Sequence, residues 1–261
     1  MSSKPDGHRI SSRLDGVEAA RGIAAVLVAM VHATGLSYSS RPDAGLPFGG
    51  LFLFAHAGVD FFFVLSGFII YRVHRGDIGS PHRLSRYAWR RFVRIYPTYW
   101  IILAGFGLLL LYSPEKDPSV TSLGNTIAST FLLPRFQRPI IPNAWTLRHE
   151  LIFYVLFGLL ILNRHLGRIL LAIWAALIAW NVTVTMWAGA PFFGGLLGYL
   201  PFRIFNLEFF FGMGVALLLG RRAVWCPRLL LLVGVVIFLG DGLLESFGPH
   251  VPIEWPPRHL G

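Results

Sequence analysis

The sequence predicts an all-α integral membrane protein that crosses the bilayer several times, and three observations support this prediction. Hydrophobic residues make up 54% of the 261 residues and charged residues only 14%, with a mean hydropathy of +0.59. A soluble domain carries about 25% charged residues, so this chain has too little polar surface for a water-soluble globule. Its apolar runs are continuous and about 20 residues long, which suits spanning helices and not the alternating strands of a β-barrel. Arginine-rich and arginine-poor connections also alternate along the chain, as expected for a polytopic protein.

The apolar runs define seven expected spans. Asp15 as N-cap with Glu18 three residues later predicts the start of the first span, and Pro97 marks the start of the third. The apolar segment 121–133 is too short to cross the bilayer, so we expect an interfacial or re-entrant helix there. The seven spans are residues 16–36, 51–72, 95–112, 145–163, 169–188, 202–220 and 229–244.

The distribution of lysine and arginine predicts the orientation of the chain. The segment before the first span and the connections after the second, fourth and sixth spans hold 15 of these residues, and the other connections and the C-terminal segment hold 5. Because basic residues stay on the cytoplasmic side, we expect the N-terminus in the cytoplasm and the C-terminus outside. The sequence shows no internal repeat or low-complexity linker, so residues 1–261 are expected to form a single transmembrane domain.

Charge and cysteine content exclude several other classes of protein. The net charge of +10 does not indicate nucleic-acid binding, because the basic residues lie between apolar spans and not on a soluble face. One cysteine excludes an intramolecular disulfide and a cysteine zinc cage. The nine histidines include no HExxH pattern, so no metal site is predicted.

Ionisable residues inside apolar spans are costly and therefore mark candidate functional sites. Arg21 and His32 lie eleven residues apart in the first span, so a helix places them on one face, about 16 Å apart along its axis. Each of the two residues also has a structural interpretation. Arg21 is alternatively a snorkelling interfacial anchor, and His32 a structural histidine bonded to a neighbouring helix.

A layer of ionisable groups is expected in the outer half of the membrane, at the depth of His32. A histidine that acts as general base needs an acidic partner, so this layer is the predicted reaction chamber. In it we assign Asp60 and Glu150 to catalysis and Arg148 and Glu208 to substrate binding. The alternative is a set of structural ion pairs, Arg148–Glu150 or Arg203–Glu208.

A second group of candidates lies on the opposite, cytoplasmic side. Arg90, Arg91 and Arg94 lead into the third span. They are either positive-inside anchors or, together with Arg21, a phosphate site, because guanidinium groups bind phosphate in a bidentate manner. For Ser66 in the second span we favour helix packing over a nucleophilic role, since no base is expected at its depth.

Four ordered segments between residues 14 and 154 resemble the acyltransferase-3 family, the multi-span membrane O-acyltransferases of bacteria. The R-x10-H pattern of that family's first helix is present as Arg21 and His32. The AWTLRHE form is similar to the exopolysaccharide acetyltransferase branch. The other three segments are GVDFFFVLSGFII at residues 58–70, RRFVRIYPTYW at 90–100 and AWTLRHELIFY at 144–154.

The resemblance implies a single acyltransferase-3-like domain in the bacterial inner membrane. It implies transfer of an acyl group, often acetyl, from acyl-CoA to a saccharide hydroxyl, with acyl-CoA as co-substrate and no tightly bound cofactor. His32 is then the catalytic residue, as general base or acyl acceptor, and Glu150 an active-site carboxylate. Arg21, Arg91 and Arg94 would contact the donor, and the other partners are the saccharide acceptor and the lipid bilayer.

Two further expectations follow from the comparison with that family. Its members usually have about ten spans of this length, so this chain is expected to be a short member or one that lacks C-terminal spans. The alternative functions are an inactive truncated relative and a transporter of a polar solute. The transporter is disfavoured because the sequence shows no paired broken helices or inverted repeats.

Overall fold

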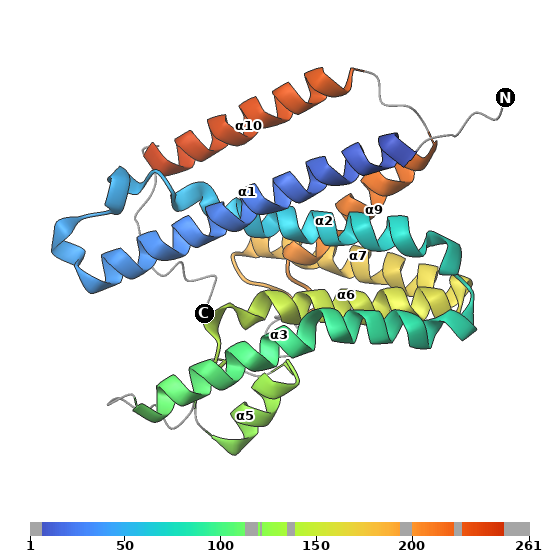
Figure 1. The fold of residues 1–261 in the computed structure, drawn as a ribbon, viewed down its shortest axis with the longest axis horizontal. Coiled ribbons are helices and arrows are strands. Elements are labelled where there is room, and N and C mark those ends of the chain that lie inside the picture. Colours follow the sequence, from blue (N-terminus) through green and yellow to red (C-terminus); the bar gives the residue numbers. More distant parts are fainter. Residues whose placement is uncertain are drawn as a thin grey trace. The chain divides into compact units, whose positions relative to one another are not determined.

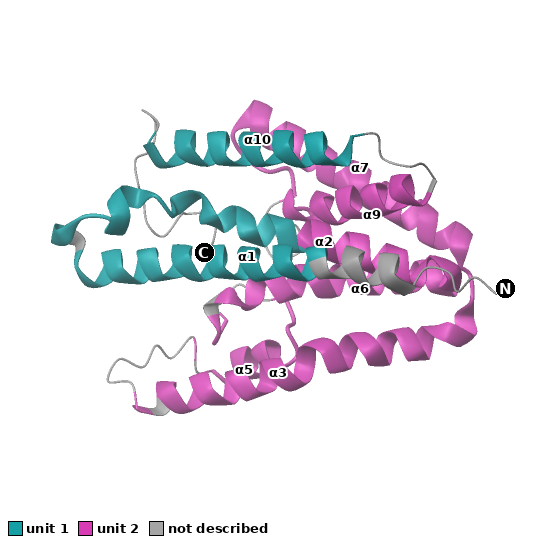
Figure 2. Cartoon of the chain, turned by 45° about the horizontal axis from the view of Figure 1, so that its top comes forward, with its two compact units in different colours: residues 1–62, 222–261 teal, residues 63–221 magenta. Residues whose placement is uncertain are grey.

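The computed structural model describes residues 7–112, 120, 122–134, 139–193, 200–221 and 226–247, which contain helices and no strand. Six helices in this part of the chain are long and apolar enough to cross a membrane, and a seventh apolar helix is shorter. The predicted all-α polytopic membrane architecture is therefore confirmed. The chain forms two compact units, residues 1–62 with 222–261 and residues 63–221 (Figures 1 and 2).

The first unit contains α1 (Gly7–Ser40), three 3₁₀ segments, the start of α2 (Ala57–His74) and α10 (Pro227–Phe247). The 3₁₀ segments are η1 (Pro42–Ala44), η2 (Pro47–Gly50) and η3 (Leu53–His56). Two glycines allow close packing in it. A Cβ at Gly58 would lie 2.8 Å from the backbone oxygen of Ala24, and one at Gly242 would lie 2.6 Å from the Phe54 ring. The start of α2 therefore packs directly on α1, and α10 packs on η3.

The start of α1 differs from the expectation. The helix begins at Gly7, so Asp15 lies inside it and the predicted N-cap is wrong. Once a helix is nucleated, adding a residue at its end costs little, so the polar residues before the span extend it. The candidate membrane span itself begins at Gly16, as expected.

The second unit packs around α6 (Trp145–Leu162), which is its most buried helix. Contacts between side chains show which parts of α2 and α3 lie beside α6. Ser66 of α2 meets Glu150, and four residues further along α6 Tyr154 meets Tyr87 of α3 (Leu84–Tyr112). The neighbouring helices are α7 (Arg164–Ala188) and α9 (Phe205–Arg221).

Close crossings hold α2, α6, α7 and α9 together. A Cβ at Gly67 would lie 2.1 Å from the backbone oxygen of Phe209, and one at Gly212 would lie 1.8 Å from that of Val64. A Cβ at Gly167 would lie 2.3 Å from the Cα of Leu160. Only glycine allows backbones to approach this closely, as is common between membrane helices.

The third membrane helix also begins earlier than predicted. α3 starts at Leu84, so Pro97 lies inside it, and the prediction that Pro97 begins the helix is wrong. Arginine is a good helix former, and a proline removes only one backbone hydrogen bond, which membrane helices tolerate. Arg90, Arg91 and Arg94 therefore lie on a helix face and not in a loop.

The predicted short helix is present as α5 (Leu123–Thr130), which lies beside α3 (Figure 1). Its last carbonyl groups have no partner within the helix, and aromatic side chains of α3 supply donors. Tyr99 donates to Ser129 over 2.6 Å, and Trp100 donates to Thr130 over 2.9 Å. An eight-residue helix is too short to cross the bilayer, as expected.

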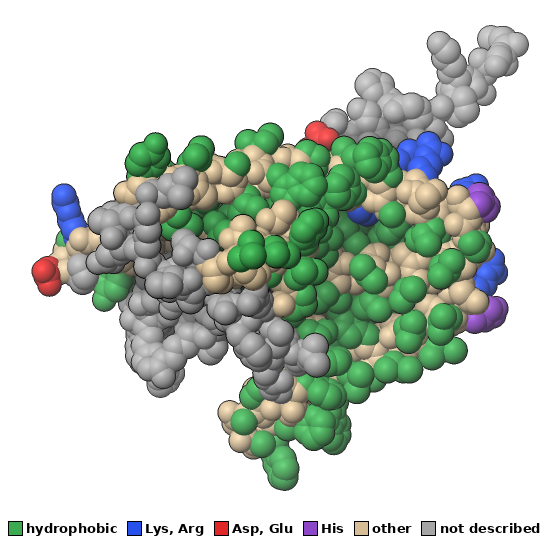
Figure 3. Space-filling view, turned by 90° about the horizontal axis from the view of Figure 1, so that it is seen from below, with side chains coloured by type: hydrophobic (Ala, Val, Ile, Leu, Met, Phe, Trp, Pro, Cys, Tyr) green, Lys and Arg blue, Asp and Glu red, His purple; other side chains and the backbone are tan. Residues whose placement is uncertain are grey.

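Three arginine-rich connections meet at one end of the second unit. The Gly79 amide donates to the carbonyl of Leu160 over 3.2 Å, and Arg164 lies against Gly79. The Arg75 guanidinium lies 3.0 Å from a Cβ built on Gly220. Figure 3 shows arginine and histidine side chains gathered at this end and hydrophobic side chains along the helices. The predicted grouping of these connections is confirmed, and the side of the bilayer that they occupy stays a prediction.

Candidate functional site

His32 has a defined hydrogen bond in the first unit. Its Nδ1 lies 2.7 Å from the backbone oxygen of Val28, one turn earlier on α1. A carbonyl oxygen only accepts hydrogen bonds, so Nδ1 carries the proton and the neutral ring has its lone pair on Nε2. The side chain is exposed.

The other two candidates of this unit lie along the same part of α1. No break interrupts α1 between Arg21 and His32, so the shared face expected from their spacing exists. Gly58 packs on Ala24 and Val28, which brings the first turn of α2, and with it Asp60, beside the stretch of α1 between the two candidates. Asp60 is half-buried and Arg21 is exposed.

Glu150 is the centre of a polar cluster in the second unit. Its Oε1 accepts hydrogen bonds from Ser66 Oγ at 3.3 Å and from the Tyr154 hydroxyl. The structure therefore places Ser66 at the depth of a carboxylate that can accept its proton, and the expectation that no base lies there is wrong. The sequence predicts a deeper position in the membrane for Ser66 than for Glu150. That prediction fails because α2 and α6 run in the same direction but are offset along their axes, which brings the two residues to one level.

Arg148 does not pair with Glu150. It is 4% exposed, and among the described residues its Nε and Nη2 have no hydrogen-bond partner. It lies within electrostatic reach of the Tyr99 hydroxyl on α3. The structural alternative of an Arg148–Glu150 ion pair is therefore wrong, and the two side chains have different neighbours.

Arg91 is held between aromatic rings. Its guanidinium carbon lies 5.7 Å from the ring centre of Tyr87 and 5.4 Å from that of Tyr154. Its Nη2 lies 3.2 Å from His74 Nε2, and its Nε and Nη1 are buried without a hydrogen-bond partner in the described part of the chain. Through Tyr154, the arginine and the Glu150 cluster share one side chain.

The orientation of Arg91 rests on a chain of polar contacts. His74 Nδ1 donates to Asp77 Oδ2 over 2.8 Å, so the neutral ring accepts from Arg91 through Nε2. Arg83 donates to the other oxygen of Asp77 over 2.5 Å. Asp77 therefore fixes the tautomer and orientation of the His74 ring, and that ring in turn holds Arg91. A hydrogen bond to the second ring nitrogen orients many functional histidines in this way.

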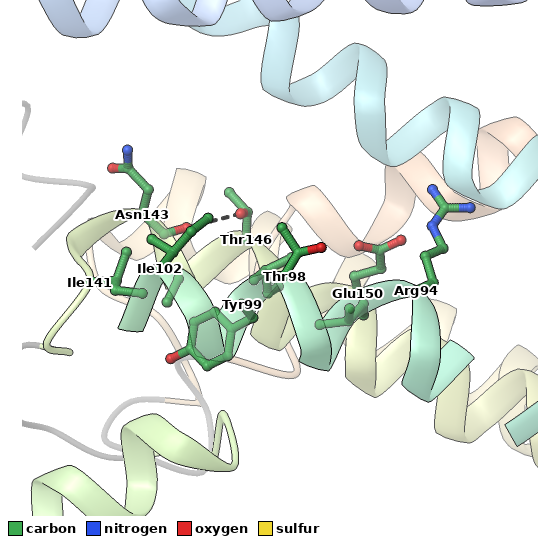
Figure 4. Close-up of a pocket in the computed structure, with 11 residues that line it drawn as sticks. Arg94, Thr98, Tyr99, Ile102, Ile141, Asn143, Thr146 and Glu150 are labelled. Atoms are coloured by element: carbon green, nitrogen blue, oxygen red, sulfur yellow. Dashed lines mark hydrogen bonds between the residues drawn. The ribbon is translucent and has the colours of Figure 1, made fainter. Parts of the chain in front are cut away.

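Arg94 and Glu150 line a cavity of about 410 Å³ between α3 and α6. Figure 4 shows these two side chains at one end of it, and Asn143 and Ile141 at the other. The remaining lining is mostly apolar or hydroxylated: Ile95, Thr98, Tyr99, Ile102, Ala144, Thr146 and Leu147. The cavity could hold a small apolar or partly polar group next to a carboxylate and a guanidinium.

A second cavity, of about 450 Å³, lies at the arginine-rich end of the unit. Its lining contains five basic or titratable cationic side chains and one carboxylate. The lining residues are Val73, His74, Asp77, His82, Arg83, Arg86, Tyr87 and Arg90. We call it the basic cavity.

Glu208 lies near the depth of Glu150. His149 Nδ1 lies 3.0 Å from Asn206 Oδ1, and Phe153 stacks on Phe209 at 4.4 Å between ring centres. These two contacts align α6 with α9, so Glu150 and Glu208 differ in depth by about one or two residues, or roughly half a turn at most. His149 itself is buried and bonded to Asn206, which is a structural role.

From the sequence alone, Ser66 is assigned to helix packing, and three other residues of these clusters, His74, Asp77 and Tyr154, are not identified. These three had a signal in the spacing. Glu150 and Tyr154 are four residues apart, and His74 and Asp77 three, which are the distances at which side chains meet on a helix. Ser66 had no such signal, because its partner lies on another helix.

Comparisons with known proteins place the chain in a family and identify a similar curated protein. A family model described as an acyltransferase domain matches residues 14–260. The exopolysaccharide production protein ExoZ of Rhizobium meliloti (strain 1021) is 32% identical to this chain over 118 residues. The match covers 42% of this chain and 35% of that relative, so the chain spans about a third of the relative's length. No solved structure gives a significant match.

Proposed function

Since this chain belongs to the acyltransferase family whose domain model covers residues 14–260, we propose that it transfers an acyl group, acetyl first of all, from acyl-CoA to a saccharide hydroxyl. The relative ExoZ is named for exopolysaccharide production, which makes an extracellular polysaccharide or its lipid-linked precursor the acceptor to test. A multi-pass membrane protein of this kind acts at the bacterial inner membrane, where acyl-CoA is available on the cytoplasmic side.

The observation that supports this proposal best is the tautomer of His32. Its Nδ1–H is bonded to Val28, so Nε2 takes the proton of the acceptor hydroxyl as the oxygen attacks the thioester carbonyl. The C–S bond then breaks, and the imidazolium returns the proton to the departing sulfur. In a second route Nε2 itself accepts the acyl group before passing it to the hydroxyl.

The donor contacts proposed here are arginines. Arg91 is held by Tyr87 and Tyr154, and its buried Nε and Nη1 have no hydrogen-bond partner among the residues that the structure describes. Arg94 lies beside Glu150 in the cavity between α3 and α6. Guanidinium groups fixed in this way suit the phosphate oxygens of the donor. Arg21 on α1 has the same role in the proposal.

The test is transfer of labelled acetyl from acetyl-CoA to a polysaccharide fraction by the purified protein in nanodiscs. His32→Ala is expected to reduce the rate by about 10²–10⁴, the usual contribution of a general base. The matched control is His56→Ala. His56 is also exposed in the first unit, and its Nδ1 lies 2.9 Å from the backbone oxygen of Leu53.

Equal loss in the two variants would assign the effect to structure and not to catalysis. Near-normal transfer by His32→Ala would remove the histidine from the mechanism. Absence of any acyl transfer by the wild-type chain, with intact binding of a polar solute, would favour the transporter.

A further inference from the structure

The basic cavity has an excess of cationic groups that its own carboxylate does not balance. Asp77 is its only carboxylate among the lining residues, and Asp77 already accepts from His74 and Arg83. Arg86 and Arg90 line the same space, and neither is among the groups that donate to Asp77 in the described part of the chain. Grouped guanidinium groups repel one another, and an anion between them relieves this.

One wall of the basic cavity is a buried, hydrogen-bonded histidine, which arginines that serve only as membrane anchors would not require. His74 is 2% exposed, is bonded to Asp77, and in turn accepts from Arg91. Within the described segments the buried Nε and Nη1 of Arg91 have no hydrogen-bond partner, which costs free energy unless a ligand completes the hydrogen bonds. His74 therefore connects the basic cavity to Arg91, of which only Nη2 has a hydrogen-bond partner among the described residues.

The position of the cavity along α3 indicates the shape of its ligand. The basic cavity and the cavity that Arg94 and Glu150 line use successive turns of α3, since Tyr87, Arg90, Arg94 and Thr98 lie on one face of that helix. The α3 residues that line the two cavities are centred about ten residues apart, or about 15 Å along the helix. A ligand with phosphate at one end and a long thin arm fits this arrangement.

We propose that the basic cavity is a binding site for a phosphate-bearing group, separate from Arg91 and Arg94, with Arg86 and Arg90 as its main ligands and His74 as the positioning residue that links it to Arg91. The source of the phosphate is the nucleotide end of the acyl-CoA donor or the headgroup of an anionic phospholipid. The first source rests on the proposed function, and the second does not.

The test measures binding without turnover, in nanodiscs of neutral phosphatidylcholine. CoA and dephospho-CoA, which lacks only the 3′-phosphate, are titrated against the wild type and the double variant Arg86→Gln/Arg90→Gln. We expect the variant to bind CoA about tenfold or more weakly, and dephospho-CoA with a smaller loss, because charge-assisted phosphate contacts are removed. Arg168→Gln, an exposed arginine of α7 outside the cavity lining, is the matched control and should bind both as the wild type does.

A second arm replaces part of the neutral lipid with phosphatidylglycerol and follows thermal stability. If the phosphate comes from lipid, phosphatidylglycerol raises the thermal stability of the wild type and not that of the double variant. The wild type and the double variant then bind CoA equally well. The proposal is overturned if the double variant matches the wild type in both arms. Failure of the wild type to bind CoA at all would contradict the proposed function, while the lipid arm would still test the cavity.

Discussion

At the scale of single residues, the carboxylate of Glu150 illustrates how this chain places charge inside a membrane. A carboxylate in a bundle of apolar helices needs hydrogen-bond donors. Ser66 and Tyr154 supply them from two helices, and Tyr154 also stacks on Arg91. The tyrosine hydroxyl thus orients the carboxylate while its ring orients the guanidinium.

A prediction at this scale concerns that tyrosine. Tyr154→Phe keeps the ring on Arg91 and removes only the hydroxyl that donates to Glu150, so acyl transfer should fall by about 10–100-fold with little change in donor affinity. Tyr87→Phe is the control, because its hydroxyl donates to a backbone carbonyl and not to the carboxylate. The measurement is kcat and KM for acetyl-CoA, and equal kinetics in the two variants would show that the Tyr154 hydroxyl has no special part.

At the scale of helices, the glycines of α2 and α9 decide which polar side chains meet. Gly67 and Gly212 allow the two backbones to approach within contact distance. Ser66 precedes Gly67 directly, so the crossing that fixes Gly67 also fixes the direction of the serine toward α6. Small residues at a helix crossing therefore position a functional group that lies on neither packing surface.

Substitution of one of these glycines tests this interpretation. Gly212→Ala places a methyl group 1.8 Å from the Val64 carbonyl oxygen. Because relief of this clash requires a backbone shift in α2 or α9, we expect a loss of roughly 1–3 kcal/mol in unfolding free energy. Gly214→Ala on the same helix has no atom within 4 Å of the new methyl group and should be neutral or slightly stabilising. Unfolding in mixed detergent measures both, and equal stabilities would show that the α2–α9 crossing is looser than described.

At the scale of the whole molecule, the charge distribution agrees with the directions of the helices in the second unit. The connections after α2 and α6 and the end of α9 lie together at one end, and α7 is 25 residues long. At 1.5 Å per residue this helix is about 37 Å long, enough to cross a bilayer core of about 30 Å.

The orientation in the membrane can be tested with two cysteines. In a Cys226→Ser background, Gly76→Cys marks the arginine-rich end and Ala190→Cys marks the end of α7. Gly76 has open space for a side chain and Ala190 is exposed. An impermeant maleimide should label position 190 in intact cells and position 76 only in inverted vesicles, because arginine-rich connections stay in the cytoplasm. Labelling of both from the same side would contradict the topology.

The sequence by itself determined the helices, their order and the gathering of the arginines, because these follow from local hydrophobicity and charge. Apolar runs of spanning length indicate membrane helices whatever their partners, and alternating charge sets their directions. The same local information placed Arg21 and His32 on one face of α1. It was wrong at Asp15 and Pro97, where polar and arginine-rich residues outside the apolar run continue the helix.

Only the tertiary structure decided which polar groups meet. The bond between Ser66 and Glu150, the stacking of Arg91 on Tyr154, and the separation of Arg148 from Glu150 depend on the offset between neighbouring helices. That offset is set by glycine crossings such as Gly67 against Phe209, at distances too small to read from a hydropathy pattern. A shift of one turn, about 5.4 Å, would leave every predicted span unchanged and would separate these partners.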